Sequence, residues 1–229
     1  MNICKSEIYN ILTRFYDKIA SLNYENNYLD ALKHFDQIAE ERLREKLEQF
    51  YVNQRSRDQA WRSCKGSLYE YAVLKYIQQI INLSNTFRIL SSNELSNYKN
   101  QIIIRNWTEI LPDIDLILLK QENIKAMISC KTSLRERLTE TAFWKRELEK
   151  QGSTIKLILI TIDKDNELKQ DNNRYILLHV IDYTFITDPT KYADLIKYYE
   201  LKYSSRPDLA KLLSRIKPIE DFPLILKSL

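Results

Sequence analysis

Apolar residues in the first third of the chain recur at the spacing of an amphipathic α-helix. They fall three or four positions apart within residues 6–22, and again within residues 28–51. A third stripe of this kind covers residues 66–81. The polar and basic stretch before it, residues 52–65, predicts a loop that leads into this helix. We therefore expect the N-terminal part of the protein to be helical.

The middle of the chain has the shorter apolar runs of β-strands. Residues 102–104 predict a short strand, and residues 114–120 and 124–131 predict two strands joined as a hairpin. Residues 155–162 and 174–181 are almost continuously apolar, which indicates buried strands, the first of them parallel to a neighbour.

A helix is expected between the hairpin and the next strand. Thr132 or Ser133 can cap it, and Glu136 lies in its first turn, where a carboxylate is favourable. The helix runs to about Lys150 and stops near Gly152.

The order of these segments is helix, strand, hairpin, helix, strand and strand. This order predicts the α/β class, with a mixed central β-sheet flanked by helices. Residues 1–60 are expected to form an added N-terminal helical region, residues 61–185 the core, and residues 186–229 a mostly helical extension of the same domain.

Glycine, cysteine and histidine contents exclude several kinds of site. Gly66 and Gly152 are the only glycines, so the chain lacks both common types of glycine-rich phosphate loop, and a nucleotide cofactor is a poor hypothesis. Three scattered cysteines without a CxxC pair argue against a structural zinc site and favour a reducing compartment. One of the two histidines, His179, lies in an apolar run and is expected in the core.

Charge and hydropathy also narrow the class of protein. A formal net charge of +4 permits a nucleic-acid partner without implying one. The N-terminus has no apolar signal-peptide core, and no apolar run approaches the roughly 18 residues of a membrane span. We therefore expect a cytoplasmic protein without a membrane partner.

The hairpin carries the most informative polar residues. Because side chains alternate between the faces of a strand, Asp113 and Asp115 share one face of the first strand. Ser129 and Lys131 share one face of the second, and Cys130 points the other way, into apolar surroundings. Two carboxylates and an ammonium group at the open end of a hairpin suit a divalent metal ion and a phosphodiester.

Phosphodiester hydrolysis needs a nucleophilic water, neutralised charge on the phosphate oxygens and help for the leaving oxygen. Carboxylate-bound Mg²⁺ supplies much of this, and a nearby lysine can orient or deprotonate the water. The minimal set is Asp113, Lys131 and one further acid. Asp115 is either an alternative metal ligand to Asp113 or a supporting partner of it.

At this hairpin the chain resembles the PD-(D/E)xK nuclease superfamily and, within it, the type II restriction endonucleases. The dipeptide at 112–113 matches PD, and the SCK sequence at 129–131 falls where (D/E)xK is expected, at the end of the following strand. The resemblance covers residues 66–181. It implies a Mg²⁺-dependent nuclease that binds double-stranded DNA.

The chain departs from the family at Ser129, where the family usually has Asp or Glu. Some restriction enzymes with a similar sequence take a glutamate from a helix instead. The resemblance implies Glu70, in the helix before the sheet, as this replacement. Glu140 and Glu147, in the helix after Lys131, are the alternatives.

The residues after Lys131 carry a second resemblance. The sequence Arg135-Glu136-Arg137 is similar to the R-(D/E)-R element of restriction enzymes that read adjacent C and G pairs. Arginine donates to guanine O6 and N7, and a carboxylate accepts from cytosine N4. These residues, with Ser133 beside them, would lie at the N-terminus of a helix that enters the major groove.

The resemblance implies a type II restriction endonuclease that cuts duplex DNA at a short palindrome as a homodimer. Asp113 and Glu70 would hold Mg²⁺, and Lys131 would assist the attacking water. The N-terminal helices would supply the dimer interface or a clamp on the DNA. Two alternatives remain open: a repair or junction-resolving nuclease that reads DNA shape, and a catalytically inactive DNA-binding protein of the same fold.

Overall fold

The chain forms two compact units, residues 1–79 and residues 80–229. The computed structural model describes residues 4–83, 86–105, 107–134 and 137–229. Within these ranges no helix is both long and apolar enough to cross a membrane. The helix α5 (Gln54–Ile81) runs without a break through residue 61, where the sequence analysis placed the start of the core.

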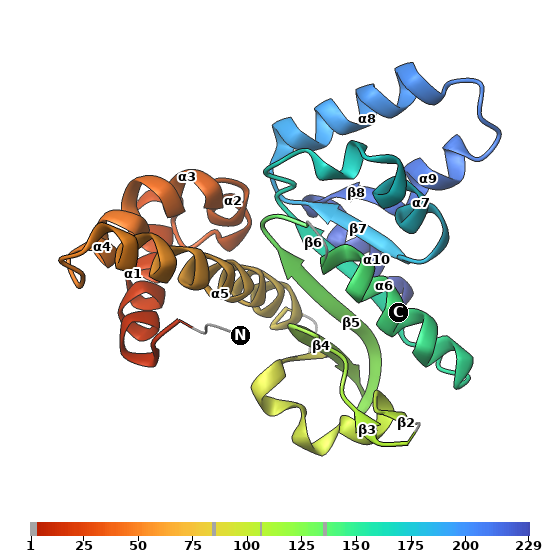
Figure 1. The fold of residues 1–229 in the computed structure, drawn as a ribbon, viewed down its shortest axis with the longest axis horizontal. Helices are drawn as coiled ribbons and strands as arrows, with labels where there is room; N and C mark the ends of the chain where they lie inside the picture. Colours follow the sequence, from red (N-terminus) through yellow and green to blue (C-terminus); the bar gives the residue numbers. More distant parts are fainter. Residues whose placement is uncertain (1–3, 84–85, 106, 135–136) are drawn as a thin grey trace. The chain divides into compact units, whose positions relative to one another are not determined.

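The N-terminal unit is built from helices, as predicted (Figure 1). Its elements before α5 are α1 (Ser6–Tyr24), α2 (Tyr28–Lys33), α3 (Phe35–Ile38), the π-helical turn η1 (Ala39–Leu43) and α4 (Arg44–Glu48). The prediction of a loop over residues 52–65 is wrong. The side chain of Asn53 accepts a hydrogen bond from the backbone N–H of Arg55 at 2.9 Å, and so caps α5 at an earlier position than the apolar stripe indicates.

Aromatic rings fill the core of this unit. The ring centroids of Phe35 and Tyr69 lie 5.1 Å apart, and both side chains are 0% exposed. Cys4 and Cys64 are joined by a disulfide, which the expectation of a reducing compartment does not anticipate. This bond ties the segment before α1 to α5.

The C-terminal unit contains a six-stranded mixed sheet in the order β1-β4-β5-β6-β7-β8. The pairs β1–β4 and β4–β5 are antiparallel, and the pairs β5–β6, β6–β7 and β7–β8 are parallel. The strands are β1 (Arg88–Ser91), β4 (Leu116–Lys120), β5 (Asn123–Lys131), β6 (Lys156–Thr161), β7 (Tyr183–Ile186) and β8 (Ile216–Pro218). A separate two-stranded sheet pairs β2 (Ile104–Arg105) with β3 (Glu109–Ile110). The predicted α/β class with a mixed sheet is confirmed.

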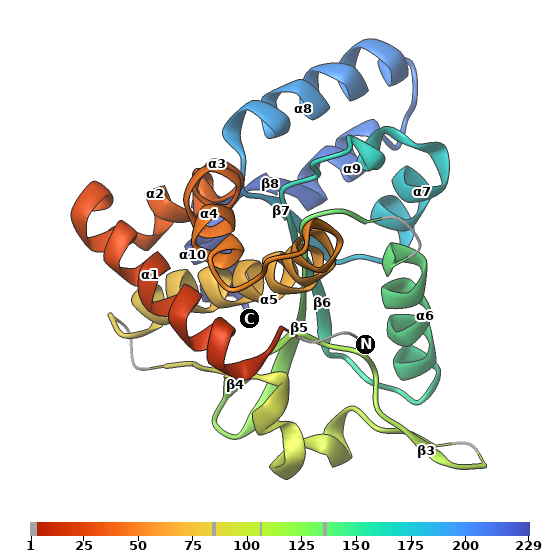
Figure 2. The same cartoon turned by 60° about the vertical axis from the view of Figure 1, so that its left-hand side comes forward.

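Helices cover both faces of the central strands (Figure 2). The helices are α6 (Arg137–Lys150), α7 (Asp171–His179), α8 (Pro189–Tyr203), α9 (Leu209–Arg215) and α10 (Phe222–Ser228). On one face, leucines of α6, α7 and α9 pack with Leu157 and Leu159 of β6 in one core cluster. On the other, Phe222 of α10 packs on Phe185 of β7, with ring centroids 5.2 Å apart.

The predicted hairpin is confirmed as β4 and β5. The two residues of its turn, Gln121 and Glu122, both have positive φ, 50° and 64°. This is the backbone of a two-residue hairpin turn whose twist matches that of the strands, and here it forms without glycine. The first strand begins at Leu116, slightly later than predicted, so Asp113 and Asp115 both precede it.

The predicted strand over residues 174–181 is wrong, because residues 174–179 belong to α7 and the last two residues follow it. Its buried residues Asn173 and Leu177 lie one helical turn apart, and the short apolar run is compatible with either structure. His179 is therefore not a core residue: it is exposed at the end of α7, and its ring lies against Tyr175 with centroids 4.5 Å apart. The adjacent strand of the sheet is β7, which follows this helix.

Candidate functional site

The ends of β4 and β5 bring a carboxylate and an ammonium group into contact. Nζ of Lys131 lies 2.7 Å from Oδ2 of Asp115 and 3.1 Å from Oδ1. Leu116 faces Ile128 in the ladder, so the preceding residue Asp115 falls beside Ser129. Lys131 is the last residue of β5 and lies further along the same face.

Asp115 accepts two further hydrogen bonds. The backbone N–H of Cys130 donates to Oδ2 at 2.6 Å, and Oγ of Ser129 lies 3.4 Å from the same oxygen. The side chains of Asp115 and Lys131 are each 5% exposed. A buried ion pair needs such additional hydrogen bonds because removing both charges from water is costly. The carboxylate is therefore fixed in place at the end of the hairpin.

The predicted alternation accounts for this convergence. Asp115, Ser129 and Lys131 fall on the face of the sheet that also carries Met127, which packs in the same core cluster as α6. Cys130 is 2% exposed and lies in the opposite phase of the strand.

Asp113 occupies a different environment from Asp115. Its side chain is exposed, and with Ser129, Thr141 and Trp144 it lines a cavity of about 10 Å³, close to the volume that one water needs. Nε1 of Trp144 is buried and has no hydrogen-bond partner among the described residues. Asp113 thus lies next to Ser129 with an accessible carboxylate, whereas Asp115 is already engaged by Lys131.

The candidate third acids lie in three different places. Glu70 is on α5, in the N-terminal unit, so the C-terminal unit by itself does not fix its distance from Lys131. Glu140 is exposed in the first turn of α6, and Glu147 accepts a hydrogen bond from Nζ of Lys150 at 2.5 Å. The geometry of the hairpin leaves this choice open.

The predicted base-reading element follows residues 132–134, which are fixed by hydrogen bonds. Arg135 and Glu136 lie outside the described residues, and Arg137 is exposed at the start of α6. Oγ of Ser133 donates to the carboxylates of Asp165, at 3.0 Å, and Glu167, at 3.1 Å. Ser133 is therefore engaged within the protein, not presented as an unbonded hydroxyl.

Sequence reasoning missed Asp165 and Glu167, which follow the buried strand β6. Because β5 and β6 are parallel, with Lys131 paired to Thr161, the segments after both strands emerge at the same edge of the sheet. The alternating acids at 163, 165 and 167, immediately after an apolar strand, were the signal that could have identified them.

The donor set at the hairpin suits a divalent cation that keeps part of its water shell. Mg²⁺ is commonly bound through one or two carboxylates together with waters and phosphate oxygens. Asp115 offers a carboxylate fixed by the backbone, and Asp113 offers an accessible one. In the described part of the chain, no group of three or more His, Cys, Asp or Glu side chains is arranged to hold a metal ion.

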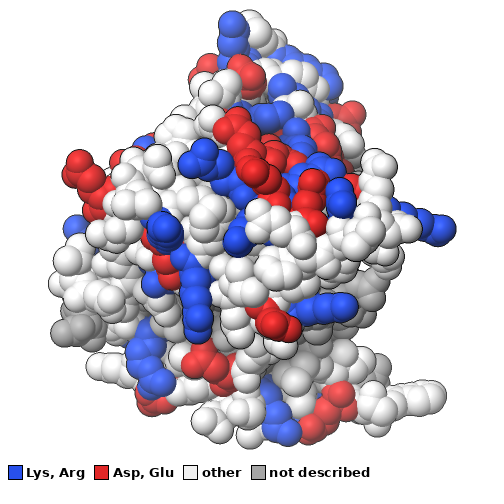
Figure 3. Space-filling view, turned by 90° about the vertical axis from the view of Figure 1, so that its left-hand side faces the viewer, with Lys and Arg blue, Asp and Glu red and all other residues white. Residues whose placement is uncertain are grey.

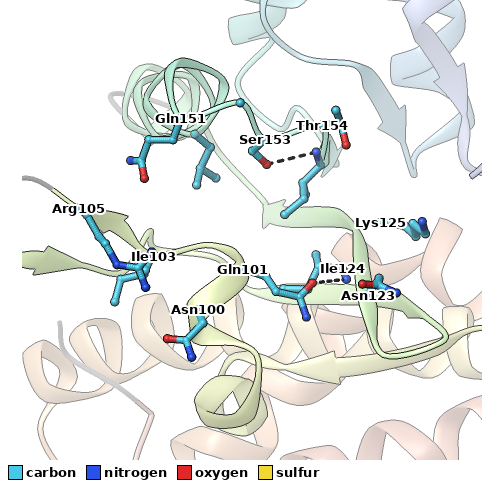
Figure 4. A pocket seen from close by; sticks show the side chains of 13 residues that line it. Asn100, Gln101, Ile103, Arg105, Asn123, Ile124, Lys125, Gln151, Ser153 and Thr154 are labelled. Atoms are coloured by element: carbon cyan, nitrogen blue, oxygen red, sulfur yellow. Dashed lines mark hydrogen bonds between the residues drawn. The ribbon is translucent and has the colours of Figure 1, made fainter.

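A larger depression, of about 420 Å³, lies at the opposite end of β5 (Figure 4). Asn100, Gln101 and Asn123 present amide groups to it, and Arg105 and Lys125 present cationic groups. Gln101 Oε1 accepts a hydrogen bond from the N–H of Ile124 at 2.9 Å. The predicted site residues are not among its lining residues, so it is separate from the Asp115–Lys131 site.

Some of the positive charge in the N-terminal unit is paired. Nζ of Lys65 donates to Asp36 at 2.5 Å and to Glu40 at 2.7 Å, and Arg44 bonds Asp58 at 2.9 Å. Figure 3 likewise shows acidic and basic side chains interleaved on one face of the molecule. A basic stretch in the sequence is therefore not by itself a phosphate-binding surface here.

Comparison with known proteins identifies the family. The model of the family described as BsaWI restriction endonuclease type 2 matches residues 94–209. The Methanocaldococcus jannaschii protein named "Putative type II restriction enzyme MjaVIP" is 34% identical over 168 residues, which cover 62% of this chain and 74% of that protein. The Helicobacter pylori protein named "Probable type II restriction enzyme HpyAORF263P" is 46% identical over 63 residues, 26% of this chain and 33% of that protein.

A solved structure shares the fold. The chain of the restriction endonuclease PspGI–substrate DNA complex superposes with a TM-score of 0.60 at 13% sequence identity, covering 96% of this chain and 92% of that one. At this identity the likeness concerns the fold alone. The family match, in contrast, is a match of sequence over half of the chain and contains β4, β5 and α6, with the Asp115–Lys131 pair. The chain therefore belongs to the BsaWI family of type II restriction endonucleases.

Proposed function

We propose that this enzyme hydrolyses both strands of duplex DNA at a short palindromic sequence, with Mg²⁺ as cofactor and as a homodimer. The observation that carries the proposal is the buried Asp115–Lys131 pair at the ends of adjacent strands, inside the segment that matches the family. A twofold protein matches the symmetry of a palindrome, because each subunit then meets the same half-site. The N-terminal unit would serve as the dimer interface or as a clamp on the DNA.

The carboxylates of Asp115 and Asp113 would hold the metal ion, with Glu70 as the further ligand. When bound, Mg²⁺ neutralises charge on the phosphate and lowers the barrier to attack by water. Asp115 suits this role because the N–H of Cys130 and Oγ of Ser129 fix its orientation before DNA arrives. We place Asp115 ahead of Asp113 as the principal ligand, since it is the carboxylate in contact with Lys131.

Lys131 would orient the attacking water and stabilise charge on the phosphate oxygens. A lysine ammonium group is a positively charged donor of hydrogen bonds, the kind of group that binds a water or a phosphate oxygen. Its position at the last residue of β5 brings it to the open edge of the sheet. Positioned general acid–base groups of this kind contribute about 10²–10⁴-fold to rate.

Base reading is assigned to Arg135, Glu136 and Arg137. Arginine to guanine is the commonest specific base contact, and a carboxylate accepts from cytosine N4, so the element favours C·G pairs. The exposed position of Arg137 at the start of α6 supports a role for this helix end in the major groove.

Incubation of plasmid DNA with the enzyme and Mg²⁺, followed by electrophoresis and sequencing of the product ends, tests the proposal. Discrete fragments with a common end sequence support it. Random nicking would instead favour a nuclease that reads DNA shape, and binding without cleavage would favour an inactive DNA-binding protein. Sedimentation of the enzyme with and without a cognate duplex tests the homodimer.

A further inference from the structure

Residues 132–134, between Lys131 and the base-reading element, are hydrogen-bonded to the loop that follows β6. Oε2 of Glu167 accepts a hydrogen bond from the backbone N–H of Leu134 at 2.5 Å and from Oγ of Ser133 at 3.1 Å. The N–H of Lys164 donates to the carbonyl of Thr132 at 3.3 Å. Each residue from 132 to 134 therefore has at least one hydrogen bond to this loop.

Leu134, the last residue of this segment, is hydrogen-bonded to the start of helix α6. The side chain of Leu134 is fully buried, and its carbonyl accepts the N–H of Arg137 at 2.8 Å. Arg137 is the first residue of α6 and the last of the base-reading element. A shift of Leu134 would therefore move Arg137 relative to Lys131.

Hydrogen bonds also fix the loop that follows β6. Asp163 is 2% exposed, and its Oδ1 accepts the N–H of Leu168 at 3.2 Å. Nδ2 of Asn173 donates to the carbonyl of Glu167 at 2.8 Å, and Nζ of Lys191 donates to the carbonyl of Lys164 at 2.9 Å. Glu167 is a buried residue with 8% exposure, so its hydrogen bonds are shielded from competing water.

We propose that Glu167 is a positioning residue for site recognition: its carboxylate fixes the segment 132–134 and so holds Arg137, the described residue of the base-reading element, in position relative to Lys131. Asp165, which accepts a hydrogen bond from the same Ser133 hydroxyl as Glu167, has a weaker supporting role. Cleavage then occurs only when the base contacts and the lysine are correctly placed together. This inference rests on the proposed function.

The test compares Glu167→Ala and Glu167→Gln with the wild type on two duplexes. One duplex contains the preferred site, defined by sequencing the product ends, and the other differs from it by one base pair. A hydrogen bond to a charged group is worth about 1.5–3 kcal/mol, roughly 10- to 100-fold. Glu167→Ala should therefore reduce the preference for the correct site at least about tenfold. Glu167→Gln should keep most of the wild-type preference for the correct site, because the amide oxygen of glutamine still accepts the N–H of Leu134.

Asp182→Ala is the matched control. Its carboxylate also accepts a backbone N–H, that of Leu157 at 2.9 Å, and pairs with Lys145 and Lys156 outside the 132–134 segment. This variant should lower the melting temperature without changing the preference. Equal preference in Glu167→Ala and wild type, or an equal loss in Asp182→Ala, would overturn the inference.

A second variant covers the case in which Glu167→Ala does not fold. Asp165 is exposed, so Asp165→Ala should fold, and it should reduce the preference by about two- to fivefold, in keeping with a weaker bond. An unchanged preference in Asp165→Ala would then count against the inference. A wild-type enzyme that shows no site-specific cleavage would instead refute the proposed function, which separates the two outcomes.

Discussion

Asp115 and Lys131 form a buried ion pair in which Nζ lies 2.7 Å from Oδ2, and each side chain is 5% exposed. Burying two charges has a desolvation cost of several kcal/mol for each ion, so such a pair is weak evidence for a contribution to stability. Its position at the open edge of the sheet, in the segment that matches the restriction endonuclease family, favours a role in the reaction.

Replacement of the lysine should abolish cleavage while leaving DNA binding nearly intact. Lys131→Ala removes the group that orients the water, and the cleavage rate should fall by about 10²–10⁴-fold. It should also lower stability by about 3–5 kcal/mol, because Asp115 loses its buried partner. Plasmid cleavage, a mobility-shift assay and thermal melting measure the three quantities.

Lys145→Ala is the control for that loss of stability. Lys145 is also buried, donates to the carbonyl of Ile155 at 2.6 Å and pairs with Asp182. This variant should melt early yet cleave at a near-normal rate per folded molecule. Normal cleavage by Lys131→Ala would refute the assigned site.

Removal of the Ser129 hydroxyl should have little effect on cleavage. Its contact with Asp115 is long, at 3.4 Å, and Cys130 and Lys131 still hold the carboxylate. At this length even a bond to a carboxylate is weak, about 1 kcal/mol or less, so Ser129→Ala should change the cleavage rate less than about fivefold. A loss of a hundredfold or more, measured in single-turnover reactions, would instead give Ser129 a direct role.

The third acid can be identified by neutral substitutions. Glu70→Gln should reduce cleavage by about a hundredfold, the scale of losing one electrostatic group of an active site, and should raise the Mg²⁺ concentration needed. Glu140→Gln and Glu147→Gln should stay close to wild type, since Glu140 is exposed and Glu147 pairs with Lys150 at the surface. Titration of cleavage with Mg²⁺ for the three variants decides among them, and a normal Glu70→Gln would remove Glu70 from the site.

Stability should depend on the charge of Asp163. Burial raises the pKa of Asp163 to about 6, against lowering contributions from the N–H groups of Leu168 and Glu167 and from Lys191. A raised folded-state pKa means that the folded protein binds the proton more tightly than the unfolded chain. The protonated Asp163 therefore contributes to the free energy of unfolding at pH values below about 4, and this contribution is lost as the pH rises through about 6.

Asp163→Asn should therefore be more stable than the wild type above pH 6, by about 1–3 kcal/mol, and this difference should vanish near pH 4. Asparagine can still accept a backbone hydrogen bond and tolerates the positive φ of 52° at this position. Melting temperatures of both proteins from pH 4 to pH 8 provide the test. A constant difference across this range would contradict the shifted titration.

The sequence predicted the hairpin well because its signals agree. Two short apolar runs, the polar residues between them, and Ser129 and Lys131 at the end of the second run all indicate the same arrangement, and β4 and β5 have nearly the expected bounds. The predicted start of the first strand, at residue 114, was too early. Because β4 starts at Leu116, Asp113 lies in the preceding loop, and Asp115 becomes the partner of Lys131.

Other errors arose where local signals were equivocal or where the decisive contacts are tertiary. The run at residues 174–181 has the length and apolar content of either a buried strand or a short helix, and packing of Leu177 against the core selected the helix. The role of Glu167 was not visible because its partner Leu134 is distant in sequence. Only the parallel pairing of β5 and β6 brings the two segments together.

The most direct test of the central claim compares Asp115→Asn with Asp113→Asn on the same plasmid in Mg²⁺. Asparagine at 115 can still accept hydrogen bonds from Cys130 and Lys131, so the fold should survive, and circular dichroism can verify this. We expect Asp115→Asn to reduce cleavage by about a thousandfold, on the scale of one essential electrostatic group, and Asp113→Asn to reduce it less. Cleavage by Asp115→Asn at the wild-type rate would contradict this expectation.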